Sequence, residues 1–187
     1  MTNIKAMYHG ISNERPLATG KRVKDMSTSQ LEISQVLGEL NKLAPAGYAL
    51  GFHIQYTTPK FMFQTYKKEW LEYYSQNGLL MSDPMVAWGF EQAGACRWSG
   101  LQDPAGVLVK AAEYGMRFGI VCASDSDGSR SIGGFSREDR EFTDLEISTI
   151  TAAVDDLHAN TADQAQLSDE TIEQLKKMSV MVTHPGS

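Results

Sequence analysis

The stretch FGIVCASDSDGSRSIGGFS, residues 118–136, decides which kind of sheet the chain can build. Two strand-like runs flank the segment DSDGS, whose Asp, Ser and Gly residues favour a tight turn. The stretch therefore predicts a β-hairpin, in which two antiparallel strands lie side by side.

Other strand candidates occur further towards the N-terminus. The run YALGFHIQY (residues 48–56) and the run FMFQTY (residues 61–66) are separated by TTPK, so this pair also predicts a hairpin. A shorter run, CRWSGL, begins at Cys96 and is a strand or a loop. We therefore expect a mostly antiparallel sheet of about five strands.

The first helix candidate precedes these strands. It begins at the cap candidates Ser27 and Thr28, carries leucines and a valine at roughly helical spacing, and ends at Pro45 and Gly47.

Further helix candidates follow the first hairpin. Residues 67–77 form one that ends at Gly78, and Asp83 is the cap candidate of a short helix that begins at Pro84. Residues 103–115 repeat the Asp-Pro start and form another.

The last part of the main domain predicts a long amphipathic helix. Ser136 is its cap candidate, with Asp139 in the position of a capping-box partner. Together these elements predict an α+β fold, an α/β/α sandwich whose central sheet is covered by helices on both faces. A sheet of this kind can hold a buried pocket on one face.

Composition divides the chain and limits its function. Residues 1–26 are polar and irregular, so we expect an arm before a main domain of residues 27–160. The net charge of −6 argues against a broad nucleic-acid-binding face. Two cysteines, no secretory signal and no membrane-length apolar run favour a soluble, cytoplasmic protein.

The segment KKEWLEYYSQNGLLMSDPMVAW, residues 67–88, is unusually aromatic. Tyr66, Trp70 and Tyr74 are four residues apart, so a helix would align them on one face, either as core or as the wall of a site. Asp83 is either a helix cap or a buried acceptor that faces the same place. Indole, phenol and carboxylate groups together suit a neutral, mostly apolar ligand with an amide and a carbonyl.

These residues belong to a longer ordered set. Trp70 and Tyr74 in WLEYY, Asp83 in DP, Trp98 in RW and Gly119 in YGMRFGI follow one another along the chain. The set, with Tyr66 before it, resembles the ligand-binding domain of LuxR-type quorum-sensing regulators, and the order of elements agrees over residues 28–160.

The resemblance implies that the ligand is an N-acyl-homoserine lactone. By this resemblance Trp70 donates to the lactone carbonyl, Asp83 accepts the amide N–H, and Tyr66 donates to the amide carbonyl. Tyr74 and Trp98 wall the head group, and Gly119 leaves room beside it.

The acyl tail would then lie between the sheet and the helices. The candidate tail contacts, of which strand alternation turns about half away, are Phe52, Ile54, Met62, Phe63, Leu79, Leu80, Val86 and Trp88. Ser131 is the candidate that holds the amide carbonyl from the last hairpin strand, with Gly133 and Gly134 as alternatives.

The family continues into a DNA-binding helix-turn-helix domain, and residues 161–187 resemble a linker and the start of that domain. The resemblance implies a homodimer that binds promoter DNA only through that domain, whose recognition helix is absent from this chain. The chain is then either a shortened piece of a regulator or a naturally short member.

Three rival interpretations remain at this stage. A PAS- or GAF-like module for another small apolar ligand would have a similar architecture, and a short regulator-like protein could inhibit a full-length partner by forming a heterodimer. Catalysis is the third, but His53 and Cys122 lie in strand candidates and no catalytic or metal-binding motif appears. We therefore expect no enzyme, no cofactor and no metal.

Overall fold

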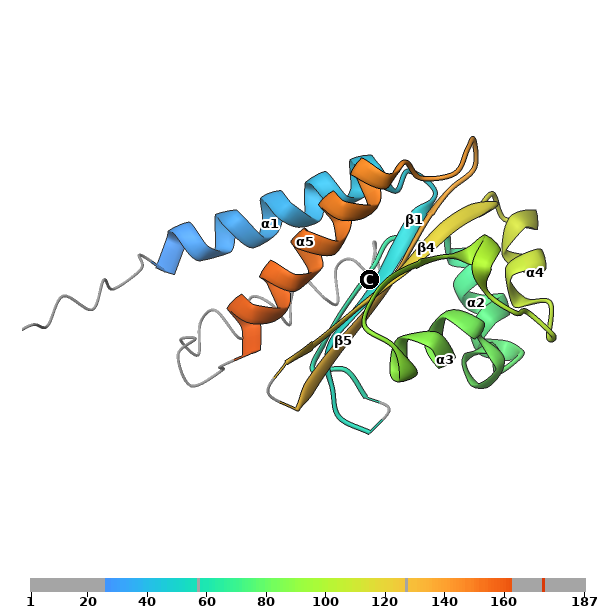
Figure 1. The fold of residues 1–187 in the computed structure, drawn as a ribbon, viewed down its shortest axis with the longest axis horizontal. Helices are drawn as coiled ribbons and strands as arrows, with labels where there is room; N and C mark the ends of the chain where they lie inside the picture. Colours follow the sequence, from blue (N-terminus) through green and yellow to red (C-terminus); the bar gives the residue numbers. More distant parts are fainter. Residues whose placement is uncertain (1–25, 57, 127, 163–172, 174–187) are drawn as a thin grey trace, which may run out of the picture.

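A computed structural model describes residues 26–56, 58–126, 128–162 and 173, and its centre is a five-stranded sheet (Figure 1). The strands are β1 (Gly47–Ile54), β2 (Phe61–Gln64), β3 (Gly94–Arg97), β4 (Phe118–Ser126) and β5 (Ser129–Arg137). They lie in the order β2-β1-β5-β4-β3, and every neighbouring pair is antiparallel. The antiparallel sheet expected from the two hairpins is confirmed.

Helices cover both faces of this sheet, which confirms the predicted sandwich (Figure 1). The helices α1 (Met26–Leu43) and α5 (Asp144–Ala162) pack on one face. The other face carries α2 (Lys68–Gln76), α3 (Pro84–Glu91), α4 (Val107–Glu113) and the short 3₁₀ helices η1 (Leu79–Ser82) and η2 (Trp98–Gly100).

The two faces of the sheet differ in the size of their side chains. On β1, Tyr48, Leu50 and Phe52 are buried in the core beneath α1 and α5. Ala49 and Gly51 alternate with them and point to the opposite face, because successive strand residues face opposite sides. One face is therefore a filled hydrophobic core, whereas the other has a floor of small residues.

A β-bulge in β1 interrupts this alternation. The pairing with β5 shifts register between Gly51 and Ile54, and His53 has a φ of 52°, in the left-handed region. Phe52 and His53 consequently both face α5, where His53 Nε2 lies 2.8 Å from Thr161 Oγ1. Ile54 is thereby returned to the open face.

The start of α5 differs from the prediction. Ser136 does not cap a helix but is buried in β5, where its hydroxyl donates to the carbonyl of Gly47 at 2.9 Å. The helix begins eight residues later, at Asp144, with a capping box formed by Thr143 and Glu146. The Glu146 backbone N–H donates to Thr143 Oγ1 (3.2 Å), and the Thr143 N–H donates to Glu146 Oε2 (2.8 Å).

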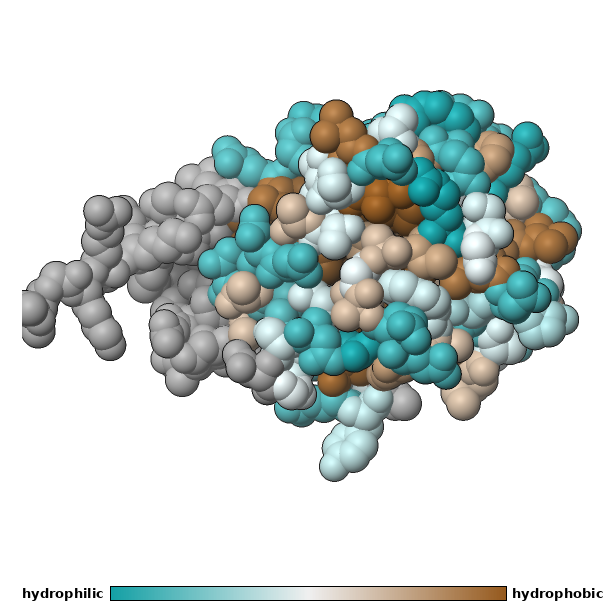
Figure 2. All heavy atoms as spheres, viewed as in Figure 1, coloured by the Kyte–Doolittle hydropathy of each residue, from teal (hydrophilic) through white to brown (hydrophobic). Residues whose placement is uncertain are grey.

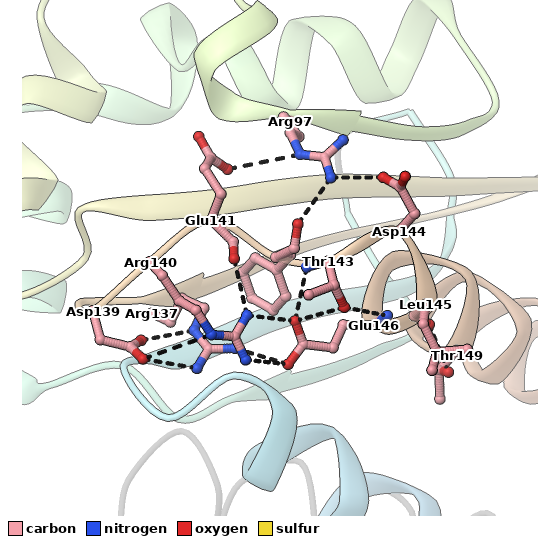
Figure 3. A network of polar contacts seen from close by, with 11 residues as sticks. Arg97, Arg137, Asp139, Arg140, Glu141, Thr143, Asp144, Leu145, Glu146 and Thr149 are labelled. Atoms are coloured by element: carbon pink, nitrogen blue, oxygen red, sulfur yellow. Dashed lines mark hydrogen bonds and ion pairs between the residues drawn. The ribbon is translucent and has the colours of Figure 1, made fainter.

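Arginine side chains tie this capping box to the end of the sheet (Figure 3). Arg137, the last residue of β5, is 2.9 Å from a Glu146 oxygen, and Arg140 binds the same carboxylate with both terminal nitrogens. Arg97, at the end of β3, donates to the Phe142 carbonyl and to Asp144. Because Arg137 and Glu146 are mostly buried, this network is screened less than an exposed ion pair would be.

The helix predicted from Asp103 also begins later than expected, at Val107. Asp103 acts from a distance: its carboxylate accepts from the backbone N–H groups of Val107 and Leu108, both at 2.8 Å. Tyr66 precedes α2 instead of lying on it, so the predicted helical stacking applies to Trp70 and Tyr74 only.

The predicted arm, linker and helix-turn-helix start lie outside the described residues, apart from positions 26, 161, 162 and 173.

On the face shown in Figure 2, hydrophobic side chains form separate patches, one of them recessed between hydrophilic side chains. Within the described ranges, no helix combines the length and apolar character needed to span a bilayer.

Candidate ligand-binding site

A cavity of about 180 Å³ lies between the small-residue face of the sheet and the layer formed by α2, α3 and α4. Its walls are mainly aliphatic and aromatic, with a few polar groups gathered at one end. The lining residues are Ala49, Gly51, Ile54, Pro59, Met62, Gln64, Tyr66, Trp70, Leu71, Tyr74, Leu80, Asp83, Met85, Val86, Phe90, Trp98, Val107, Leu108, Ala111, Met116, Ile132 and Gly134.

Asp83 is the charged group in this lining, and only 3% of its surface is exposed. Its Oδ1 accepts the backbone N–H of Met85 at 2.8 Å and caps α3, so the expected capping role is present. Its Oδ2 accepts the Tyr74 hydroxyl, also at 2.8 Å. Since two carboxylate oxygens offer about four acceptor positions, Asp83 keeps capacity for another donor inside the cavity.

The pKa of the Asp83 carboxyl is raised above its ordinary value, because burial raises it by more than the hydrogen bonds from Tyr74 and from the backbone N–H groups of Met85 and Val86 lower it. Burial and the nearby Asp83 charge also raise the pKa of the Tyr74 phenol. Tyr74 therefore stays protonated at neutral pH and acts as a donor to the carboxylate.

Trp70 stands beside this pair. Its ring centroid lies 5.5 Å from that of Tyr74, and it lines the cavity while only 3% exposed. Among the described residues its indole N–H has no hydrogen-bond partner. Tyr73 and Tyr114, which the sequence did not single out, pack against the Trp70 ring and against each other.

Tyr66 also lines the cavity, but its hydroxyl is already engaged. It donates to the backbone carbonyl of Gly134 on β5 at 3.0 Å. Because a phenol has a single O–H, donation to a ligand carbonyl would require this bond to be exchanged. Burial and the Asp83 charge raise the pKa of Tyr66, so the proton needed for either bond is retained.

Trp98 and Gly119 form one unit of the wall. A Cβ atom on Gly119 would lie 2.2 Å from Trp98 Cε2, so the glycine makes room for the indole ring. The Trp98 N–H is fully enclosed and has no partner among the described residues. Trp98 therefore presents carbon atoms, and no donor, to the cavity.

The predicted tail contacts divide between the two faces. Ile54, Met62, Leu80 and Val86 line the cavity, whereas Leu79 packs behind the wall without lining it, and Trp88 does not line it. Phe52 and Phe63 belong to the core beneath α1 and α5, which corrects their assignment as tail contacts. The reason is strand alternation, which the bulge at His53 resets in time to return Ile54 to the cavity.

The expectation for Ser131 is also corrected. Ser131 is fully buried on the α5 side of β5, where its Oγ lies 2.7 Å from His158 Nδ1 and accepts the backbone N–H of His53. Gly134, the alternative in register, does line the cavity because it is an odd number of residues away.

Several lining residues were missed by sequence reasoning. Gln64 looks like the solvent-facing position of a short strand, and Met85, Phe90, Met116 and Ile132 carry no motif. Strand register identifies both Gln64 and Ile132. Gln64 is paired with Ala49 and Ile132 with Gly51, and these two β1 residues face the cavity.

A buried apolar cavity with a few convergent polar groups is typical of a small-molecule binding domain. A family model for the autoinducer binding domain matches residues 46–162, which hold all the cavity-lining residues. The chain belongs to this family, the ligand-binding domains of LuxR-type quorum-sensing regulators. No curated protein matches the chain.

Solved structures of this class share the fold. The first is described as the N-acylhomoserine lactone dependent LuxR family transcription factor CepR2 from Burkholderia cenocepacia, with 14% identity and a TM-score of 0.51, covering 81% of this chain and 85% of that one. The second is SdiA, an Escherichia coli protein, in complex with octanoyl-rac-glycerol, with 18% identity and a TM-score of 0.53, covering 76% of this chain and 68% of that one. At these identities the likeness establishes the fold alone.

Proposed function

We propose that this domain binds an N-acyl-homoserine lactone in the cavity. The observation that carries the proposal is the buried Asp83 carboxylate, which faces a mainly apolar cavity beside the Trp70 indole N–H, a donor without a hydrogen-bond partner among the described residues. An acceptor next to a donor complements a secondary amide that is attached to a lactone.

In the proposed complex, Asp83 accepts the amide N–H and Trp70 donates to the lactone carbonyl. Tyr66 exchanges its bond to Gly134 for the amide carbonyl of the ligand. Tyr74 keeps Asp83 oriented and, with Trp98, encloses the head group. The acyl tail extends over the small residues of β1 towards Ile54.

An acylated glycerol is the nearest rival ligand, since the SdiA structure contains octanoyl-rac-glycerol. Its hydroxyl groups could also donate to Asp83. Its ester carbonyl can also accept from Tyr66, so it differs from the lactone in lacking the amide N–H for Asp83 and the ring carbonyl for Trp70.

The test begins with protein produced in the presence of a lactone panel and of octanoyl-rac-glycerol, followed by mass spectrometry of the extracted ligand. We expect a lactone to be retained. Asp83→Asn, which preserves a cap acceptor but presents an NH₂ group to the ligand amide, should weaken lactone binding by about 1–3 kcal/mol. Retention of the glycerol alone, or equal lactone affinity of the variant, would count against the proposal.

Asp103→Asn provides the matched control. It makes the same change at a carboxylate that caps α4 but does not line the cavity. We expect its lactone affinity to equal that of the wild type.

The remaining expectations concern the whole regulator. We propose that it is a cytoplasmic homodimer that binds promoter DNA through a helix-turn-helix domain beginning within residues 161–187, while this chain alone does not bind DNA. The net charge of −6 supports the last point.

A further inference from the structure

Gln64 on β2 is a polar residue in an apolar part of the cavity. Apart from Trp98, whose N–H is enclosed, and from Tyr66, Trp70, Tyr74 and Asp83, which form the polar clamp at one end, it is the only one of the described cavity-lining residues with a polar side chain. All the other lining residues are aliphatic, aromatic, thioether or glycine residues.

Strand register places Gln64 relative to the clamp. Ala49 on β1 is paired with Gln64 on one side and with Gly134 on the other, so the three form a row across the sheet. All three line the cavity. Gly134 is also the residue whose carbonyl accepts the Tyr66 hydroxyl, so this row lies directly beside the clamp.

The next row lies further from the clamp. Gly51 is paired with Met62 and with Ile132, and these three residues also line the cavity. Rows on the same face are two residues apart, or about 6.6–6.8 Å along the strand. Gln64 therefore faces the first part of a chain that leaves the clamp, and Met62 and Ile132 face a later part.

The carboxamide of Gln64 has no hydrogen-bond partner among the described residues. It carries two donors and one acceptor, and an apolar ligand covering it would leave these groups desolvated and unpaired. A ligand with an oxygen at this level would instead receive a hydrogen bond.

We propose that Gln64 is a specificity-determining residue that selects acyl chains bearing an oxygen close to the amide, of the 3-oxo class. This inference rests on the proposed function, because the clamp must hold the amide for the third carbon to lie beside Gln64. The Gln64 side-chain amide donates to the chain oxygen. Beyond this level the cavity is apolar and accepts a plain hydrocarbon tail.

The test compares 3-oxooctanoyl- and octanoyl-homoserine lactone, which have the same chain length, by isothermal titration calorimetry. We expect the wild type to bind the 3-oxo ligand about 5- to 10-fold more tightly, the factor that corresponds to one neutral hydrogen bond. Gln64→Met, which keeps the length of the side chain but removes its amide, should reduce the ratio to about one.

Two further variants make the comparison specific. Gln55→Met makes the same change at an exposed glutamine outside the cavity and should keep the wild-type preference. Gln64→Asn keeps an amide but withdraws it by one methylene, so it should also lose the preference. It provides the test if Gln64→Met proves unstable.

The outcomes separate the two ideas. If the wild type binds both lactones with equal affinity, or if Gln64→Met keeps the preference, Gln64 does not select the chain oxygen and the inference fails, while the proposed function stands. If neither lactone binds the wild type, the proposed function fails and this inference fails with it.

Discussion

Replacing Gly119 with alanine tests how the cavity wall is built. The added Cβ would lie 2.2, 2.3 and 2.6 Å from Cε2, Cδ2 and Cζ2 of Trp98, more than 1 Å inside the 3.4 Å at which ordinary contact begins for the nearest atom. Three close atoms in one ring mean that the indole lies flat over the glycine. Since Gly119 is held in β4 by its pairing with Ser136 of β5, the indole must move.

That movement costs free energy, because Trp98 is only 5% exposed and its ring can move only by disturbing its packing or by entering the cavity that it lines. Overpacking of this kind lowers stability by about 1–3 kcal/mol. For a chain of this size each kcal/mol lowers the melting temperature by roughly 2–4 °C, so we expect a fall of roughly 2–12 °C. The displaced ring narrows the cavity, so the rise in melting temperature on adding lactone should also shrink.

Differential scanning calorimetry with a double-mutant cycle isolates the cause. Gly38→Ala, in α1, adds a Cβ with nothing within 4 Å and should raise stability by up to about 1 kcal/mol. Gly119→Ala combined with Trp98→Phe should destabilise less than the sum of the single changes, since the smaller ring relieves the overlap. A melting temperature of Gly119→Ala within 1 °C of the wild type, or strict additivity, would refute the reasoning.

Two other changes test the α5 side. Burial, with the charges of His158 and Lys60, lowers the pKa of His53 to about 4, so stability is fully present above its ordinary pKa of 6.5 and is lost as the pH falls towards 4. His53→Asn, which suits the left-handed backbone, should lose up to about 2 kcal/mol less than the wild type between pH 7 and pH 5 in urea unfolding, and identical pH profiles would contradict this. Thr143→Ala removes the cap of α5 and should lower unfolding free energy by about 1 kcal/mol, whereas the control Ser148→Ala, within the helix, should not; equal stabilities would exclude the capping role.

The sequence predicted the sheet and the meeting of Trp70, Tyr74 and Asp83 because the signals for both are local. The turn segment between β4 and β5 specifies a hairpin by itself, and Asp83 before Pro84 specifies both a cap and a fixed carboxylate. Asp83, Trp70 and Tyr74 then meet because two short helices follow one another closely.

The predictions from sequence were wrong where pairing between strands that are distant in the sequence decides the role or the face of a residue. SRED at Ser136 and TDLE at Thr143 are equivalent capping patterns locally, and pairing of β5 with β1 and β4 settles which one caps. Ser131 and Phe52 were misplaced because the face of a strand residue depends on register. The bulge at His53, which no local pattern announces, changes that register.

The alternation of large and small residues along β1 has a consequence for how such domains diversify. Tyr48, Leu50 and Phe52 belong to the framework, whereas the intervening Ala49 and Gly51 line the cavity. One eight-residue strand thus carries two independent sets of positions, interleaved but separated by the thickness of the sheet. Substitutions at every second residue can therefore reshape the cavity while the framework on the other face stays as it is.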